Sequence, residues 1–316
     1  MPVIFGKAPG KIILFGEHAV VYGQPAIAIP VQDVTATARV TPIIGAGSGK
    51  VRVQAHDIQL DTMLNDLPED HPLAAAIRAT LDEITPYHTP SFTIQVDSTI
   101  PIAAGMGSGA AVTVATIRAL SAFLGEPLPN ERISEMAYEI EKIHHGTPSG
   151  IDNTVVTFQK PVYFQRGEPL QTLTPTKPTY WVIADTGEKT PTIETVSDVH
   201  SLYESDPETY EAIFAEIGQI TRDARQALCQ GDLDQLGPLM NHNQLLLQKL
   251  EVSSMRLEKF ITAAREAGAV GAKLSGGGRG GNIIALTTYE RLSQLEKYLL
   301  EEGAVRVMST VLRETA

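Results

Sequence analysis

The sequence predicts an α+β protein, and three observations support that class. The chain has 316 residues, of which 43% are hydrophobic and 20% charged, as expected for a globular protein of about two domains with a sizeable core. The first hundred residues alternate apolar and polar side chains with the two-residue period of strands. From Ala110 onward, helical spacing dominates, interrupted by short strand-like segments. These patterns indicate the class and leave the topology open.

The expected strands lie mainly in the first hundred residues. The segments "VTATARV", "VRVQAHDIQL" and "FTIQV" each alternate in the manner of a half-buried strand. The glycines of "IIGAGSGKV" lie between the first two segments and predict a hairpin loop that joins them directly.

Two helices are expected next. Residues 110–124 are apolar nearly all round, which predicts a buried helix. Residues 131–145 have the pattern of an amphipathic helix, with Asn130 as its N-cap and Gly146 as its stop. Glu141 lies on the shoulder of the apolar stripe of this second helix, about a quarter-turn from its centre, where it can reach the edge of a cleft.

The segments after residue 145 predict a change from one domain to the next. "HHGTPSGIDN" is typical of a loop, and "TVVTF" and "VYF" after it predict strands. The Pro- and Thr-rich stretch "QTLTPTKPTY" predicts a linker, which divides the chain into domains of residues 1–177 and 178–316. The second domain is expected to hold helices near residues 206–230, 233–249 and 254–267, a helix in "YERLSQLEKYLLEEG" and a last strand in "VRVMSTVL".

Charge and cysteine content exclude several classes. A formal net charge of -12 argues against a nonspecific nucleic-acid binder, and it requires local cations, backbone N–H groups or a metal to hold any anionic substrate. The single cysteine, Cys229, excludes an intramolecular disulfide and fits a reducing compartment such as the cytoplasm. Residues 98–117 carry no charge, but Pro101 and three glycines interrupt them, so we expect no membrane span.

Three glycine-rich segments carry the functional signal: "KAPGKIILFGEHAVVYG", "PIAAGMGSGAAV" and "KLSGGGRGGNIIAL". In the second, Gly105, Gly107 and Gly109 let the backbone approach a ligand closely. The helix expected from Ala110 presents its free N–H groups and partial positive charge at the same place. This combination predicts a phosphate-binding loop.

In this order, the three segments resemble the three motifs of the GHMP kinases. The opening "APGKIILFGEHAVVYGQPAIAIP" resembles the mevalonate kinase branch in particular, and the motifs extend from Ala8 to Ala285. The resemblance implies the two-domain α+β GHMP kinase fold with the active site in the interdomain cleft. It also implies ATP and Mg²⁺ as cofactors and direct in-line transfer of phosphate to the 5-hydroxyl of mevalonate, a small-molecule partner.

The resemblance assigns roles around the reacting groups. Asp152 in "SGIDN" matches the catalytic aspartate, and Lys11 in "APGK" matches the lysine beside it. A carboxylate there can orient the hydroxyl and take its proton, while the ammonium stabilises charge on the γ-phosphate. Glu141 and Ser108 match the Mg²⁺ ligands. Gly109 departs from the family, which commonly has a second serine at this position.

The remaining assignments concern the nucleotide and the acceptor. The nucleotide is expected to contact the second and third segments at Pro101, Gly105, Met106, Gly107, Ser108, Gly109, Ala110, Ala111, Gly276, Gly277 and Gly278. Glu17, His18 and Thr192 match residues of the mevalonate pocket, where His18 could donate to the carboxylate of mevalonate. Arg279 interrupts the glycines of the third segment, and contact with phosphate and exposure to solvent are equally open for it.

Several neighbouring functions stay open as alternatives. They are phosphomevalonate kinase, homoserine kinase, diphosphomevalonate decarboxylase and a non-catalytic ligand sensor. The intact Lys11, Glu141 and Asp152 argue against a sensor, and the "GKIILFGEH" turn argues against the decarboxylase. Few basic residues surround the expected acceptor pocket, which argues against a phosphorylated acceptor. A homodimer is left open as the assembly state.

Overall fold

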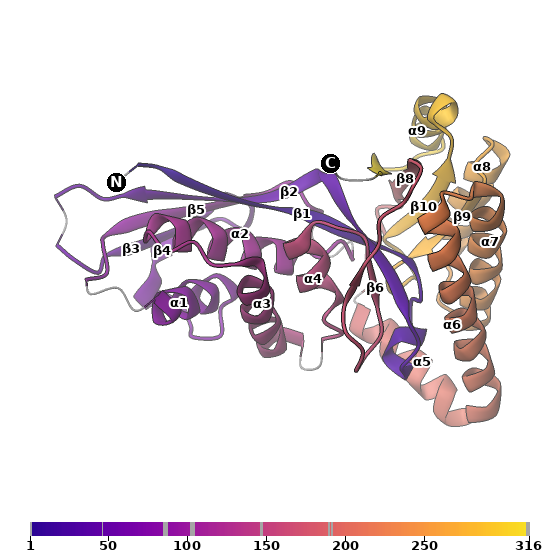
Figure 1. Ribbon diagram of the computed structural model, residues 1–316, viewed down its shortest axis with the longest axis horizontal. Coiled ribbons are helices and arrows are strands. Elements are labelled where there is room, and N and C mark those ends of the chain that lie inside the picture. Colours follow the sequence, from indigo (N-terminus) through magenta and orange to yellow (C-terminus); the bar gives the residue numbers. More distant parts are fainter. Residues whose placement is uncertain are drawn as a thin grey trace. The chain divides into compact units, whose positions relative to one another are not determined.

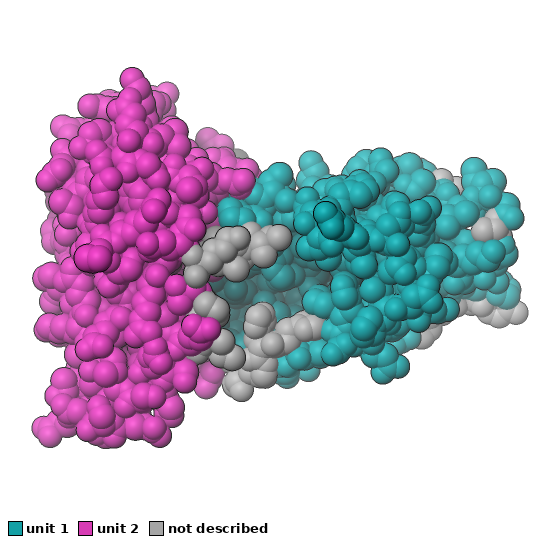
Figure 2. All heavy atoms as spheres, turned by 180° about the vertical axis from the view of Figure 1, so that it is seen from behind, with its two compact units in different colours: residues 1–11, 34–101, 107–159 teal, residues 12–33, 102–106, 160–316 magenta. Residues whose placement is uncertain are grey.

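The computed structural model describes residues 2–45, 47–84, 88–101, 105–145, 148–188, 190 and 192–313. The chain forms two compact units, which Figure 2 colours separately. The first unit contains residues 1–11, 34–101 and 107–159, and the second contains residues 12–33, 102–106 and 160–316. The expected division between residues 177 and 178 falls inside the second unit. The second unit already includes residues 160–177, and strands β1 (Ile4–Phe15) and β2 (Ala26–Pro42) each contribute residues to both units.

The strands of the first unit are not in sequence order. β2 pairs with β5 (Phe92–Ser98), β5 pairs in parallel with β3 (Val51–Ala55), and β3 pairs with β4 (Leu60–Met63). β5 therefore lies between the two strands that the glycine segment was expected to join as a hairpin. That prediction was wrong because alternation identifies a strand and its buried face, but not its partner.

Among the described residues of the first unit, four α-helices accompany the strands, and Figure 1 shows them on one side of these strands. They are α1 (Pro72–Ile84), α2 (Ser108–Phe123), α3 (Asn130–His145) and α4 (Ile151–Phe158). The α2 and α3 helices confirm the two helical predictions, while α1 was not expected. "TVVTF" was expected to be a strand, and this prediction was wrong. The segment lies in α4, where its β-branched side chains are buried, so burial rather than intrinsic propensity decides the conformation.

Helix α2 is the centre of this unit, with most of its side chains buried as predicted. Its one charged residue, Arg118, donates hydrogen bonds to the Lys7 carbonyl (2.7 Å), to Asn130 Oδ1 (3.0 Å) and to the Thr157 carbonyl (2.5 Å). These partners belong to β1, α3 and α4, so one guanidinium ties the helix to three other elements.

The second unit is built on a four-stranded antiparallel sheet in the order β11-β8-β10-β9. The strands are β8 (Thr179–Asp185), β9 (Gly271–Ser275), β10 (Asn282–Thr287) and β11 (Arg306–Leu312). β9 and β10 form a hairpin, and the third glycine-rich segment is its loop. This unit also contains the short strands β6 (Val162–Phe164) and β7 (Gln171–Thr172); β6 pairs with both β2 and β7.

Helices cover this sheet much as the sequence predicts. They are α5 (Thr192–Ser205), α6 (Pro207–Gln230), α7 (Leu233–Lys249), α8 (Met255–Glu266) and α9 (Leu292–Glu301). Three of them begin at an oxygen-bearing N-cap that accepts a backbone N–H, namely Asp206, Asp232 and Ser254. α5 was not expected. In the described part of the chain, no helix is long and apolar enough to cross a membrane.

Candidate active site

Lys11 and Asp152 form an ion pair within the first unit. Lys11 lies on β1 with its side chain 6% exposed, and its Nζ is 2.9 Å from Asp152 Oδ1. Asp152 belongs to the first turn of α4, where the helix dipole favours a negative charge. The Asp152 side chain is 32% exposed, so the carboxylate can bond the buried ammonium and still meet a ligand. The structure thus brings together the two residues that were assigned as catalytic.

The start of α4 is anchored to α3 by a residue that sequence reasoning missed. The buried Asn153 amide donates to the Ser134 carbonyl (3.1 Å) and to Ser134 Oγ (3.0 Å). Thr154 Oγ1 donates to the Gly150 carbonyl (2.7 Å), which closes the first turn. The signal was an amide beside Asp152 in an otherwise apolar turn. Because of these bonds, the position of Asp152 is set by two helices rather than by a loop.

The second glycine-rich segment lies directly against this pair. Gly107 has a φ of 68°, a left-handed conformation that glycine adopts without strain. A Cβ at this position would lie 2.8 Å from Lys11 Cγ and 3.6 Å from Asp152 Oδ2. Glycine is therefore required at position 107 for two reasons, the left-handed conformation and the close approach to Lys11.

Helix α2 begins at Ser108, and its N-terminus provides hydrogen-bond donors. Gly107 is its N-cap and supplies no side-chain oxygen, so the first N–H groups of the helix keep their bonding capacity for a ligand. Met106, Ala110 and Ala111 are all buried, at 1%, 1% and 0% exposure, and contact between them and a nucleotide stays a prediction. At Gly109, a Cβ would have no described atom outside the helix backbone within 4 Å, which leaves room for a larger side chain.

Glu141 completes this group from helix α3. Burial raises the pKa of Glu141 well above its usual value, the negative charge of Asp152 adds to this rise, and Lys11 opposes it. A buried carboxylate beside a second, negatively charged carboxylate is a fitting donor for Mg²⁺, which takes one or two protein carboxylates and keeps several waters. Among the described residues, no cluster of three or more His, Cys, Asp or Glu side chains forms a site that could hold a metal entirely by itself.

In the second unit, Glu17 is buried and bonded to Lys273. Both side chains are almost fully buried, at 1% and 0% exposure, and Lys273 Nζ donates to Glu17 Oε1 and to the Leu274 carbonyl (2.7 Å). Burial lowers the pKa of Lys273, and the charge of Glu17 opposes that shift. Lys273 was missed at first, although a charged residue inside the apolar strand "GAKLS" is the signal that could have found it. A direct contact between Glu17 and the acceptor stays a prediction.

His18 follows Glu17 in a left-handed conformation, with a φ of 60°. Its Nε2 lies 3.0 Å from the Gly277 carbonyl, and because a carbonyl can only accept, Nε2 carries the hydrogen. Burial lowers the pKa of His18 to about 4, helped by the positive charges of Lys273 and Arg279. The ring is thus neutral at pH 7, and its free nitrogen, Nδ1, is a hydrogen-bond acceptor. We expect this ring to meet an acceptor molecule through a hydroxyl rather than by donating to a carboxylate.

The third glycine-rich loop is attached to the first motif. Ser275 Oγ donates to the Ile13 carbonyl at 2.7 Å, which adds to the His18–Gly277 bond. Gly276 has a φ of 90°, and a Cβ there would have no described atom within 4 Å, so this end of the loop is open. The Arg279 guanidinium bonds Asp198 and the Glu251 carbonyl while its side chain stays 34% exposed, and its contact with phosphate stays a prediction.

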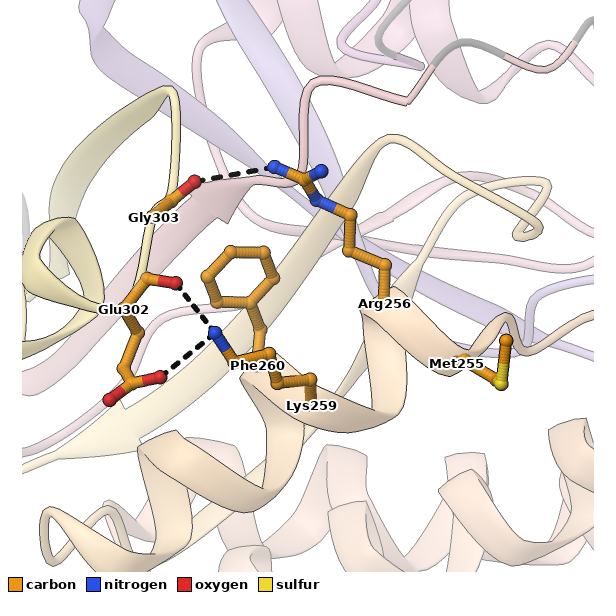
Figure 3. Close-up of a pocket in the computed structure, with 6 residues that line it drawn as sticks. All are labelled: Met255, Arg256, Lys259, Phe260, Glu302 and Gly303. Atoms are coloured by element: carbon orange, nitrogen blue, oxygen red, sulfur yellow. Dashed lines mark hydrogen bonds and ion pairs between the residues drawn. The ribbon is translucent and has the colours of Figure 1, made fainter.

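Thr192 and a surface pocket of the second unit lie apart from the contacts described above. Thr192 is the first residue of α5, and its side chain lies outside the described residues. A pocket of about 340 Å³ lies on α8 of the second unit (Figure 3). Its two cations are already bonded, Arg256 to the Gly303 carbonyl at 3.4 Å and Lys259 to Glu302. The described lining of this pocket includes no residue assigned to the active site, so we do not place the reaction there.

Comparison with known proteins gives the family. The model of the GHMP kinases N terminal domain matches residues 72–160, and that of the GHMP kinases C terminal matches residues 224–305. A mevalonate kinase of Pyrococcus horikoshii is 35% identical over 98% of this chain and 96% of its own length. Another, of Pyrococcus abyssi, is 37% identical over 90% of this chain and 88% of its own. The expected domain boundary lies between the two matched regions and stays a prediction.

Solved structures agree with these relatives. The crystal structure of L. major mevalonate kinase in complex with R-mevalonate has a TM-score of 0.83 and 28% identity, with 100% of this chain and 97% of that chain covered. The structure of Methanococcus jannaschii mevalonate kinase has a TM-score of 0.84 and 27% identity, with coverage of 100% and 99%. With motifs, fold and full-length relatives in agreement, this chain belongs to the GHMP kinase family, and the relatives that it matches along its length are mevalonate kinases.

Proposed function

We propose that the protein is an ATP- and Mg²⁺-dependent mevalonate kinase. It would phosphorylate the 5-hydroxyl of mevalonate, giving 5-phosphomevalonate and ADP for isoprenoid biosynthesis. The observation that carries this proposal is the Lys11–Asp152 ion pair beneath Gly107, because it combines a base, a cation and a close-lying glycine backbone. The mevalonate kinases that are 35% and 37% identical over most of the chain support mevalonate as the acceptor.

Asp152 and Lys11 would act on the acceptor hydroxyl. The Oδ2 atom of Asp152 is the one not bonded to Lys11 at 2.9 Å, so it can accept the hydroxyl hydrogen and take the proton as the new P–O bond forms. The Lys11 ammonium stabilises the negative charge that the transferred phosphoryl group carries. Phosphoryl transfer requires mainly positioning and charge stabilisation from a protein, and these two side chains can provide both without a phosphoenzyme.

The N-terminus of α2 would hold the nucleotide phosphates. Gly107 brings the backbone close, and the first N–H groups of a 16-residue helix carry a partial positive charge. In a protein of net charge -12, such local donors are needed to bind an anionic nucleotide. The residues Gly276–Gly278 stay assigned to the nucleotide on the strength of the family resemblance.

Glu141 and Ser108 would hold Mg²⁺. The rise in the pKa of Glu141 next to Asp152 is the observation that fits a cation, since a metal relieves repulsion between neighbouring carboxylates. Bound there, Mg²⁺ would neutralise phosphate charge and orient the γ-phosphate. Gly109 supplies no hydroxyl, so Ser108 is the one hydroxyl that this turn of α2 offers.

Glu17, His18 and Thr192 would serve the acceptor pocket. We propose that Glu17 acts indirectly, by holding Lys273 and the turn that carries His18. The neutral His18 ring would accept a hydrogen bond from a hydroxyl of mevalonate through Nδ1. Thr192, at the start of α5, stays assigned to the pocket on the strength of the family resemblance.

An acceptor comparison tests the proposal. ADP release is measured with mevalonate, phosphomevalonate, homoserine and galactose, each at saturating ATP and Mg²⁺. We expect mevalonate to be preferred by at least about 100-fold in kcat/KM, because a site that bonds the acceptor's polar groups rejects analogues that lack them. Preference for another acceptor, release of CO₂, or nucleotide binding without turnover would overturn it in favour of a different GHMP kinase, the decarboxylase or a sensor, respectively.

The proposal also covers the cellular compartment, the ligands and the assembly state of the protein. We propose a cytoplasmic enzyme, because a chain with one cysteine needs no oxidising compartment. The net charge of -12 supports small molecules rather than nucleic acids as ligands. A homodimer is proposed as the assembly to test, and sedimentation at micromolar concentration distinguishes it from a monomer.

A further inference from the structure

Arg279 occupies a backbone conformation that normally calls for glycine. It lies in the hairpin loop between β9 and β10 with a φ of 56°, in the left-handed region. Its neighbours Gly278 and Gly281 also have positive φ angles, of 81° and 75°. A large side chain in this conformation is strained, so the surrounding contacts must hold it there.

Those contacts use both the backbone and the side chain of Arg279. Its N–H donates to the Val252 carbonyl at 2.6 Å, and its own carbonyl accepts from Thr190 Oγ1 at 3.0 Å. The guanidinium Nε donates to the Glu251 carbonyl at 3.1 Å, and Nη1 pairs with Asp198. One residue therefore bonds the turn between α7 and α8, the segment before α5, and α5 itself.

These bonds divide the loop into a closed half and an open half. A Cβ at Gly278 would lie 2.1 Å from the Val252 carbonyl oxygen, and one at Gly280 would lie 2.8 Å from the Glu188 carbonyl oxygen. At Gly276, by contrast, a Cβ would meet no described atom within 4 Å. The closed half that contains Arg279 is thus a fixed support, and the open half at Gly276 is free to face a ligand.

Arg279 of this closed half bonds helix α5 through Asp198. Asp198 lies in its second turn, with the buried Thr195 and Val199 on either side in sequence. Near its C-terminal end, the Tyr203 ring packs against Tyr22 at a centroid distance of 5.1 Å. α5 is therefore held at one end by an aromatic contact to the first motif and near the other end by Arg279 of the third motif.

We propose that Arg279 is a positioning residue that joins the third glycine-rich loop to α5, so that the loop and the acceptor-side helix keep one geometry. The inference rests on the proposed function, since α5 begins at Thr192, the residue assigned to the acceptor pocket. Contact between Arg279 and a nucleotide phosphate is the rival reading. The Asp198 carboxylate on the same guanidinium opposes it, because that negative charge would repel a phosphate.

Two single variants and their combination distinguish these readings. Arg279→Gly removes the side chain and suits the left-handed backbone, and Asp198→Ala removes its partner. Each is expected to raise the KM for mevalonate about fivefold, which corresponds to about 1 kcal/mol for a partly exposed ion pair. The double variant should be no worse than either single one, kcat should change less than about twofold, and Arg279→Lys should recover part of the loss.

The matched control is Lys259→Ala. It breaks the Lys259–Glu302 pair, whose side chains are 57% and 31% exposed, close to the 34% and 52% of Arg279 and Asp198. This control pair lies in the same unit, and Lys259 bonds Glu302 rather than the glycine-rich loop. Lys259→Ala should leave the KM for mevalonate and the KM for ATP unchanged. Binding of a fluorescent ATP analogue should stay within about twofold in all variants, since the open half of the loop is intact.

Three outcomes would overturn the inference. They are a loss of ATP-analogue affinity in Arg279→Gly alone, additive effects in the double variant, and an Asp198→Ala variant that behaves as wild type. Amide hydrogen exchange of residues 192–205 tests the link without any substrate. Exchange should be faster, to the same extent, in both single variants and unchanged in Lys259→Ala. If the wild type fails to phosphorylate mevalonate, the proposed function fails, and this exchange measurement still decides on the role of Arg279.

Discussion

At the scale of single residues, the chemistry depends on charges that are buried with a partner. Lys11 is 6% exposed and would lose hydration without compensation if Asp152 were absent. Lys273 is fully buried, and without Glu17 its positive charge would lack this buried carboxylate partner. The two lysines are thus alike in burial, but their partners differ, because the Asp152 side chain is 32% exposed and that of Glu17 only 1%.

The first prediction concerns Asp152. Asp152→Asn keeps the shape of the side chain and removes the base, so kcat should fall by about 10²–10⁴-fold, the usual value of general-base assistance. Affinity for an ATP analogue should stay within about threefold, because the N-terminus of α2 is unchanged. Steady-state kinetics and equilibrium titration measure the two quantities. Turnover near the wild-type rate would remove Asp152 from the mechanism.

The second prediction concerns the buried Glu17–Lys273 pair. Lys273→Met leaves the Glu17 carboxylate buried without its ammonium partner and should lower the free energy of unfolding by about 3–5 kcal/mol. The double variant Glu17→Gln/Lys273→Met should recover more than half of this loss, because neither charge remains. Urea unfolding of the wild type and the two variants measures the effect. Equal losses in the single and double variants would show that packing, not charge, governs the site.

The third prediction concerns pH. The pKa of His18 is lowered from 6.5 to about 4 in the folded protein, so the unfolded chain binds a proton more readily. This contribution to stability is present above pH 6.5 and is lost as the pH falls toward 4, by up to about 3 kcal/mol. His18→Asn, a residue tolerated in the left-handed region, should lack this part of the pH dependence. The free energy of unfolding of the wild type and of His18→Asn, measured between pH 7 and pH 4, tests this prediction. The same pH dependence in the two proteins would contradict it.

At the scale of elements, the glycine loop and helix α2 work as a unit. Gly107 gives the turn its left-handed conformation and lets the backbone lie on Lys11. Ser108 then begins helix α2, and most of the side chains of this helix are buried. Asn153 fixes α4 against α3 in the same way that Arg118 fixes α2 against three neighbours. Rigid helices, rather than loops, therefore hold the donors in position.

The fourth prediction compares two glycines two positions apart. Gly107→Ala adds a Cβ 2.8 Å from Lys11 Cγ at a φ of 68°, so it should displace Lys11 and reduce kcat/KM by at least about tenfold. Gly109→Ala meets no described atom outside the helix within 4 Å and lies in the helix, so it should reduce kcat/KM less than Gly107→Ala does. Kinetic constants for both variants give the answer. A harmless Gly107→Ala would mean that the loop does not need this close approach.

At the scale of the whole molecule, an acidic chain has to bind an acidic ligand. The net charge of -12 repels a nucleotide, and the site itself contains the carboxylates of Glu141 and Asp152. A divalent cation reverses this local balance because its charge is close to the phosphates while the net charge is spread over the surface.

The fifth prediction follows from that balance. ATP with Mg²⁺ should stabilise the protein against heat by about 2.7 kcal/mol when the nucleotide is at 100 times its Kd. The same ATP concentration with EDTA in place of Mg²⁺ should stabilise it by less than about half as much. Thermal denaturation with Mg²⁺ alone as a control measures both. Equal shifts with and without the metal would exclude metal-assisted binding.

Local properties of the chain were enough to predict much of this protein. Periodicity and caps identified α2, α3, α6, α7 and α8 to within a few residues, because helical spacing and capping act over a few neighbours. The order of the three motifs identified the family, and the spacing of the glycines predicted a phosphate-binding loop. The resemblance assigned roles to Lys11, Glu141 and Asp152, and these roles stay predictions.

The tertiary structure decided what depends on distant parts of the chain meeting. It placed β5 between β2 and β3, and it made "TVVTF" a helix because α2 and α3 bury its β-branched side chains. It paired Glu17 with Lys273, which are 256 positions apart, and Arg279 with Asp198. A local pattern contains no information about such partners, since burial and ion pairing are set by whichever segment packs opposite. The sequence by itself therefore determined the family and the residue types available to the site, and the fold decided which of these distant residues meet.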